Sequence, residues 1–210
     1  TWISICGLHD TQLIGEMGQA FDISPLILED ILNTDQRPRF SESDDHLYVI
    51  MKASYFGTDD HNIHMEQISL IVGPNYLISI QESDIDFFKE IKQRIYNGKS
   101  RIRGAGSDYL CYALADSLVD NYIIHIETLG NAIEEQEKAL LLSNQELKME
   151  DIYHYKTELS YLRKNVRPVK EVMTRFSNSD SPLIQDKTYI FLHDLDDLVV
   201  QAQEAIEIYY

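Results

Sequence analysis

Residues 181–210 read SPLIQDKTYIFLHDLDDLVVQAQEAIEIYY, and this stretch predicts one long helix around which the rest of the chain is arranged. No Gly, Asn or Pro stands near Tyr210, so we expect the helix to continue beyond that residue. Asp194, Asp197 and Glu204 recur at helical spacing and predict an acidic line beside the apolar seam. Apolar side chains at spacings of three and four form that seam: Leu192, Leu195, Val199, Ala202, Ile206 and Tyr209.

The composition indicates a folded and strongly acidic chain. Hydrophobic residues make up 44% of the 210 residues, enough to bury a sizeable core. Asp and Glu number 35 against 18 Lys and Arg, which gives a net charge of −17. The resulting field repels phosphate backbones, so we expect cations and no nucleic acid as partners. Solubility alone is the simpler reason for such an excess of acidic residues.

Short motifs give no support to an enzyme. Phosphate-binding, dinucleotide-binding, serine-hydrolase and zinc-protease signatures are all missing from the sequence. Cys6 and Cys111 are too few for a disulfide framework, and a reducing compartment is expected. His61 and His64 lie in a polar loop, where solvation is a better interpretation than metal binding. No apolar run approaches the roughly 18 residues that a membrane span needs.

The first hundred residues predict a sheet with helices packed on it. Gly73-Pro74-Asn75 predicts a tight hairpin between two apolar strands. Asp10, Ser24 and Asp84 are expected to cap three helices, the last of which ends at Gly98. The strands are expected at 2–8, 47–56, 67–72 and 76–81. The inward side chains of the first two helices are expected to be Leu13, Met17, Phe21, Leu28, Ile31 and Leu32.

The second half of the chain predicts only helices. Residues 99–107, KSRIRGAGS, are the only locally basic and glycine-containing stretch. We therefore divide the chain into an α/β domain, 1–104, and a helical domain, 105–210. Two long antiparallel helices are expected at 108–143 and from 144 to about 176, and the last helix follows them.

Several carboxylates lie on or beside the apolar seams. Any single one is best interpreted as an exposed flank residue or as the partner of a lysine. Two carboxylates about 4 Å apart repel by roughly 1 kcal/mol in water and up to about 4 kcal/mol at a protein surface, so such a pair needs a neutralising partner. Mg²⁺ suits this role because it takes oxygen ligands and often uses only one or two carboxylates. The candidates are Glu29, Asp30, Asp116, Asp120, Asp194 and Asp197.

Five blocks of the sequence, in order, resemble the cytoplasmic part of CorA-type magnesium and cobalt transporters. The resemblance implies an α/β (α+β) fold, with an N-terminal mixed sheet, two long antiparallel helices and a stalk helix. It also implies a homopentamer at the cytoplasmic face of the cell membrane, with membrane helices and pore beyond Tyr210. The blocks are SPLILEDILNTDQRPRF, EQISLIVGPNYLISIQE, DYLCYALADSLVDNY, ELSYLRKNVRPVKEVM and the closing helix.

The resemblance further implies regulatory metal sites between neighbouring subunits. By position, Asp30 of one subunit is expected to face Asp194 of the next and to hold Mg²⁺, with Co²⁺ or another divalent cation as a possible substitute. Glu29 and Asp116 are the candidates for a second site. Leu198 stands where some relatives carry a histidine, so this second site is expected to be weaker or absent.

The resemblance implies feedback control of transport. At high Mg²⁺ concentration the bound ions would hold the ring of subunits closed, and at low concentration carboxylate repulsion would loosen it. Two alternatives stay open. One is a relative in the same superfamily that moves zinc or another ion, and the other is a free-standing acidic helical binding module. An enzyme ranks third.

Overall fold

The computed structural model describes residues 1–58, 62–98, 101–142 and 149–209. Its centre is a five-stranded sheet in the order β1-β5-β4-β3-β2, in which β1 runs parallel to β5 and the other neighbours are antiparallel. The mixed sheet predicted from the sequence is therefore confirmed. The strands are β1 (Trp2–Cys6), β2 (Arg39–Glu42), β3 (Leu47–Phe56), β4 (Ile63–Val72) and β5 (Leu77–Gln81).

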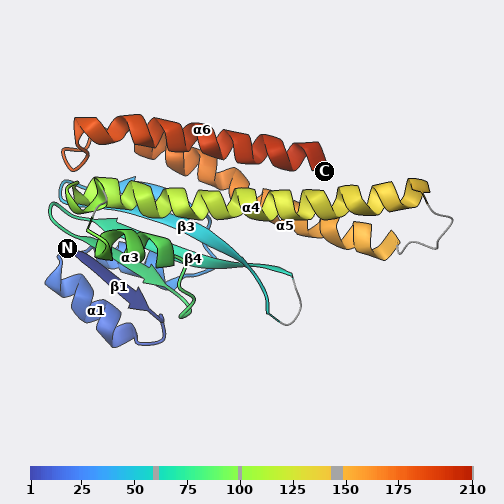
Figure 1. Ribbon diagram of the computed structural model, residues 1–210. Coiled ribbons are helices and arrows are strands. Elements are labelled where there is room, and N and C mark those ends of the chain that lie inside the picture. Colours follow the sequence, from blue (N-terminus) through green and yellow to red (C-terminus); the bar gives the residue numbers. More distant parts are fainter. Residues whose placement is uncertain (59–61, 99–100, 143–148, 210) are drawn as a thin grey trace.

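Helices cover both faces of this sheet (Figure 1). The short helices α1 and α2 pack on one face, and three long helices lie over the other. The long hairpin and the final helix agree with the sequence prediction. The helices are α1 (Thr11–Ala20), α2 (Pro25–Leu32), α3 (Lys89–Tyr96), α4 (Ser107–Leu142), α5 (Met149–Ser177) and α6 (Asp186–Tyr209), with a 3₁₀ turn at Arg101–Arg103.

Strands β3 and β4 are buried on both faces of the sheet along most of their length. Successive side chains of a strand point to opposite faces. Val49 and Met51 of β3 accordingly join the core under the long helices, whereas Tyr48 joins the smaller core under α1 and α2. The two layers of helices therefore pack on opposite faces of the same sheet.

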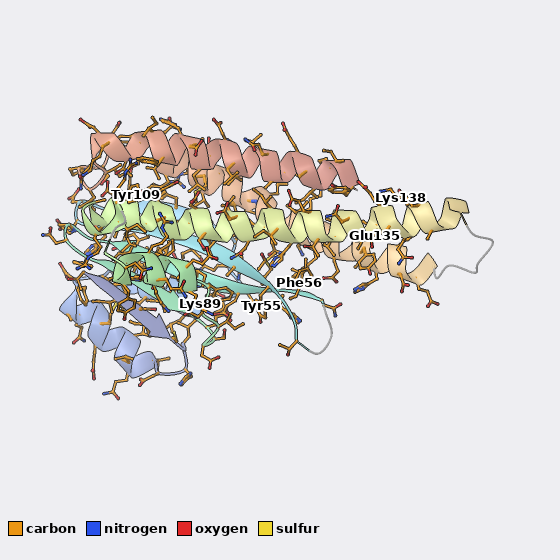
Figure 2. The ribbon with its side chains drawn as sticks, viewed as in Figure 1. Tyr55, Phe56, Lys89, Tyr109, Glu135 and Lys138 are labelled. Atoms are coloured by element: carbon orange, nitrogen blue, oxygen red, sulfur yellow. The ribbon has the colours of Figure 1, made fainter. Side chains whose placement is uncertain are left out.

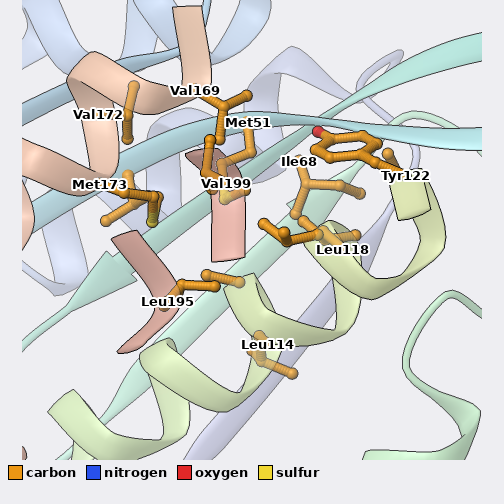
Figure 3. Close-up of a cluster of buried hydrophobic side chains, with 14 of the residues drawn as sticks. Met51, Ile68, Leu114, Leu118, Tyr122, Val169, Val172, Met173, Leu195 and Val199 are labelled. Carbon is orange, nitrogen blue, oxygen red and sulfur yellow. The ribbon is translucent and has the colours of Figure 1, made fainter. Parts of the chain in front are cut away.

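The larger core joins the sheet to the three long helices (Figure 3). Leu118 of α4, Met173 of α5 and Val199 of α6 are each almost completely buried there. The Tyr122 hydroxyl on α4 donates a hydrogen bond to the backbone carbonyl of Lys52 on β3. The α6 seam predicted from its spacing is buried as expected at Leu192, Leu195, Val199, Ala202 and Ile206.

Two predicted helix starts and one predicted helix cap need correction. The final helix begins at Asp186 and not near residue 181, and the third begins at Lys89 and not after Asp84. Gln81 Nε2 donates hydrogen bonds to the backbone carbonyls of Ser83 and Ile85, at 2.7 Å each, and this holds the connection in a loop. The second helix begins at Pro25 as expected, but its preceding serine makes no side-chain capping bond.

The inward faces of the short helices agree with the prediction at Met17 and Ile31 and differ from it at Leu13 and Leu32. Helix α1 buries Ile14 and leaves Leu13 exposed, and α2 buries Ile27 and Ile31 while Leu32 is exposed. Leu13 and Ile14 are adjacent in sequence and so lie about 100° apart around the helix, which is enough for one to be buried and the other exposed. The division near residue 104 remains a prediction. None of the described helices has both the length and the hydropathy of a membrane span.

Candidate functional site

The four predicted site residues lie in two separate places. Glu29 and Asp30 are on α2, which packs on one face of the sheet, whereas Asp116 is on α4 and Asp194 is on α6, over the other face. Helices α4 and α6 pack side by side. Within one chain, the fold therefore brings Asp116 and Asp194 together, and the sheet separates both from Asp30.

Asp116 lies at the contact between α4 and α6, where its ionised form is unfavourable. Partial burial, followed by the nearby carboxylates of Asp120 and Asp194, raises its pKa to about 6. The Arg94 guanidinium and a hydrogen bond from Tyr112 oppose this rise in pKa but do not cancel it. The negative charge here is thus incompletely compensated by the chain itself.

One line of side chains on α4 extends this acidic surface. Tyr112, Asp116 and Asp120 are four residues apart and so lie above one another on the helix. Burial, followed by the Glu90 carboxylate of α3, raises the pKa of Asp120. Asp194 is exposed on the neighbouring helix. We call Asp116, Asp120 and Asp194 the α4–α6 carboxylate cluster.

Aromatic rings fix the two helices at one end of this cluster. Phe191 of α6 contacts Tyr109 and Tyr112 of α4, with ring centroids 5.2 and 5.4 Å apart (Tyr109 is labelled in Figure 2). The Arg101 guanidinium lies over the Phe191 ring at 4.9 Å from its centroid. The aromatic contacts limit how far α4 and α6 can separate to relieve the repulsion.

Asp30 has a different environment, because its own chain neutralises it. Its carboxylate is buried, and Arg39 Nη1 lies 2.7 Å from Asp30 Oδ2. Gln36 Nε2 donates a hydrogen bond to the other oxygen, Oδ1, at 2.6 Å. Neither partner was predicted from the sequence. The available signal was an opposite charge nine residues after Asp30.

Side chains of the sheet hold the end of α2 that carries Asp30 by hydrogen bonds. Gln67 Nε2 of β4 donates to the Ile31 carbonyl at 3.0 Å, and Lys52 Nζ of β3 donates to the Thr34 carbonyl. The first bond satisfies a carbonyl group that the end of the helix leaves without a partner, and the second ties the chain just beyond the helix to β3. The Asp30 carboxylate is thus attached to a fixed backbone, whereas Glu29 beside it is exposed.

The described residues of one chain do not by themselves supply enough ligands for a metal site. Among the described residues, no three His, Cys, Asp or Glu side chains converge as metal ligands. In the loop that was weighed as a histidine site, His61 lies outside the described residues, and the His64 ring stacks on Tyr55 at 5.5 Å between centroids.

The chain is similar to known transporters over its whole length. It is 32% identical over 207 residues to the cobalt/magnesium transport protein CorA of Thermotoga maritima, a match that covers 99% of this chain and 59% of that protein. The soluble domain of CorA from Methanocaldococcus jannaschii superposes with a TM-score of 0.83 at 22% identity, covering 99% of this chain and 82% of that one. For the cytoplasmic domain of ZntB from Vibrio parahaemolyticus the TM-score is 0.80 at 16% identity, covering 99% and 81%.

These matches agree with the family resemblance drawn from the sequence blocks. The chain spans about three fifths of the length of the Thermotoga protein. Residues 1–210 match the family described as CorA-like Mg²⁺ transporter protein, and the chain belongs to that family.

Proposed function

We propose that this chain is the cytoplasmic, Mg²⁺-sensing part of a homopentameric transporter for Mg²⁺ and Co²⁺ in the cell membrane. Family membership supports the transport role, and the similarity to the cobalt/magnesium transport protein of Thermotoga maritima supports the choice of ions. The chain's task would be regulation of transport and not catalysis.

The observation that carries the sensing role is the α4–α6 carboxylate cluster. Its central member, Asp116, has a pKa raised to about 6 by burial and by two other carboxylates. Such a raised pKa means that ionisation of Asp116 is unfavourable in the folded chain, and a bound cation would relieve the part of this cost that comes from repulsion between the carboxylates. A hard divalent cation is the partner that relieves it most, because all the candidate ligands are oxygen atoms. Zn²⁺ is favoured less, since its structural sites usually contain thiolate or imidazole ligands.

The principal site would lie between subunits. Asp30 and Asp194 are on opposite sides of the sheet, so they can share an ion only if they come from neighbouring chains. Glu29, exposed beside Asp30, and Asp116, close to Asp194, would supply the second site. An ion bridging two chains stabilises the arrangement in which both carboxylates are close. Mg²⁺ would therefore favour the closed ring only if it binds that ring more tightly than the open one.

The fold offers a route from the sensing carboxylates to the membrane. Asp194 is on α6, and this helix is buried along its seam against α4 and α5. A change in the spacing of the carboxylates would move α6 as a rigid element. In the proposed full-length protein this helix leads towards the membrane helices.

Limited proteolysis tests this proposal. Protein stripped of metal with a chelator is digested with and without millimolar Mg²⁺, as wild type, Asp30→Asn and Asp194→Asn. Protection by Mg²⁺ in the wild type, lost in both variants, is the expected result. Asp186→Asn is the matched control because Asp186 is an exposed carboxylate on the same helix and is not a candidate ligand. Equal protection in wild type and in both site variants would overturn the proposal. Parallel titrations with Co²⁺ and Zn²⁺ test the preferred ion.

A further inference from the structure

The proposed metal ligand Asp30 already holds a cation from its own chain. Arg39 Nη1 lies 2.7 Å from Oδ2, and Gln36 Nε2 lies 2.6 Å from Oδ1, so each carboxylate oxygen accepts a bond within the chain. A charge-assisted bond between a guanidinium and a carboxylate is among the stronger hydrogen bonds in proteins. A divalent cation that binds Asp30 therefore meets a site that is already occupied.

The two partners of this ion pair differ in their freedom to move. The Asp30 side chain is 10% exposed, and its helix end is tied to the sheet through the Ile31 carbonyl. The Arg39 side chain is 46% exposed and starts from β2, the strand at the edge of the sheet. The guanidinium can therefore turn into solvent while the carboxylate stays in place. Arg39 is the displaceable member of the pair.

We propose that Arg39 is an internal competitor of Mg²⁺ at Asp30 and sets the Mg²⁺ concentration at which the sensor responds. This inference rests on the proposed function, since it takes Asp30 to be a metal ligand. At low Mg²⁺ the guanidinium neutralises Asp30, and at high Mg²⁺ the divalent cation displaces it from Oδ2. An arginine at this position lowers the affinity of the site and moves its response to higher Mg²⁺ concentrations.

A purely structural role for Arg39 predicts a different result. If the ion pair only fixes the loop between α2 and β2, its loss would lower the stability of the protein and leave the Mg²⁺ midpoint unchanged. Competition predicts that its loss strengthens Mg²⁺ binding. The two roles therefore predict different changes in the midpoint.

The test is the Mg²⁺ concentration that gives half-maximal protection from protease, measured on four variants. Arg39→Gln should lower this midpoint by roughly fivefold or more, because a cation a few ångströms from the ion no longer opposes it. Arg39→Lys keeps the charge without the guanidinium fork and should fall between wild type and Arg39→Gln. Arg37→Gln is the matched control, since it removes the same charge from an exposed residue in the same turn. Its midpoint should stay within about twofold of wild type, as expected for a screened surface charge. Asp30→Asn should abolish protection.

The outcomes separate the inference from the function on which it rests. Abolition of protection by Asp30→Asn, together with an unchanged or higher midpoint in Arg39→Gln, would overturn the competition and leave the sensor intact. Protection that Asp30→Asn does not alter would overturn the metal site itself. An equal fall in Arg37→Gln and Arg39→Gln would assign the effect to net charge and would also overturn the competition. If Arg39→Gln does not fold, as judged by its thermal unfolding, the Arg39→Lys midpoint decides, and no fall in it contradicts the inference.

Discussion

Asp108 Oδ2 lies 2.6 Å from Thr188 Oγ1, and this hydrogen bond joins the first turn of α4 to the first turn of α6. The same oxygen accepts a bond from the backbone nitrogen of Gln185 at 2.9 Å. Asp108 is fully buried, so water cannot replace either bond. One carboxylate thus closes the start of α6 and fixes the position of that helix against α4.

Replacing Asp108 by alanine should destabilise the protein strongly. The substitution leaves the buried hydroxyl of Thr188 and the backbone nitrogen of Gln185 without their acceptor, at a cost of about 2 to 4 kcal/mol in the free energy of unfolding. Urea denaturation measures this change. Asp186→Ala is the control, since Asp186 is exposed in the same first turn of α6, and it should cost less than about 1 kcal/mol. Equal losses in the two variants would contradict the capping role of Asp108.

Replacing Asp116 by asparagine should stabilise the metal-free protein at neutral pH. The folded pKa of Asp116 is raised from 3.8 to about 6, so ionisation costs more in the folded than in the unfolded state. This penalty is absent below about pH 4, grows as the pH rises towards 6 and is constant above that range. After allowance for screening by solvent, its removal should raise the free energy of unfolding by about 1 to 2 kcal/mol at pH 7.

Thermal unfolding at pH 4 and pH 7 measures the Asp116 effect. The gain from Asp116→Asn should be present at pH 7 and nearly absent at pH 4, because the wild-type carboxyl is then largely protonated when folded. Asp197→Asn, on the exposed face of α6, should change the melting temperature much less. A lower melting temperature of Asp116→Asn at pH 7, or the same gain at both pH values, would show that ionisation of Asp116 is not unfavourable in the folded protein.

His125 should make the protein less stable as the solution becomes acidic. Burial lowers its folded pKa from 6.5 to about 4, and its Nδ1 is within 2.8 Å of the Ser54 hydroxyl. Below about pH 6.5 the unfolded chain takes up a proton that the folded chain refuses, so stability falls until the pH approaches 4. The full loss is about 3 kcal/mol.

The pH dependence of urea unfolding between pH 7 and pH 4.5 tests this role of His125. In His125→Gln the decline in stability towards low pH should be shallower than in the wild type. His193→Gln, at an exposed position on α6, serves as control and should keep the wild-type slope. Identical slopes in all three proteins would mean that His125 is protonated as readily in the folded as in the unfolded chain.

Local spacing was sufficient to predict most elements and the α6 seam. The seam needs only the periodicity of Leu192, Leu195 and Val199, and the hairpin after Val72 needs only its turn residues. The start of α6 could not be predicted in this way. Its cap is Asp108, which is 77 residues earlier in the chain than Gln185. A contact between such distant residues depends on the packing of α4 against α6.

The candidate site shows the same limit. Position beside the apolar seams gave six candidate carboxylates, and the resemblance to the family selected Asp30, Asp116 and Asp194 among them, whereas no short motif did. Their environments depend on tertiary structure. Asp30 is buried against Arg39, and the pKa of Asp116 is raised first by burial and then by Asp120 and by Asp194 of α6. Spacing on one helix can place Asp116 above Asp120, but it contains no information about the neighbouring helix.

Sedimentation velocity of metal-free protein, with and without millimolar Mg²⁺, tests the central claim most directly. If Mg²⁺ bridges Asp30 of one chain and Asp194 of the next, the ion should shift the wild type towards a pentamer, and Asp30→Asn and Asp194→Asn should each abolish the shift. A sedimentation coefficient that stays the same at every Mg²⁺ concentration, or a shift that both variants retain, would contradict the claim that these carboxylates sense Mg²⁺ between subunits.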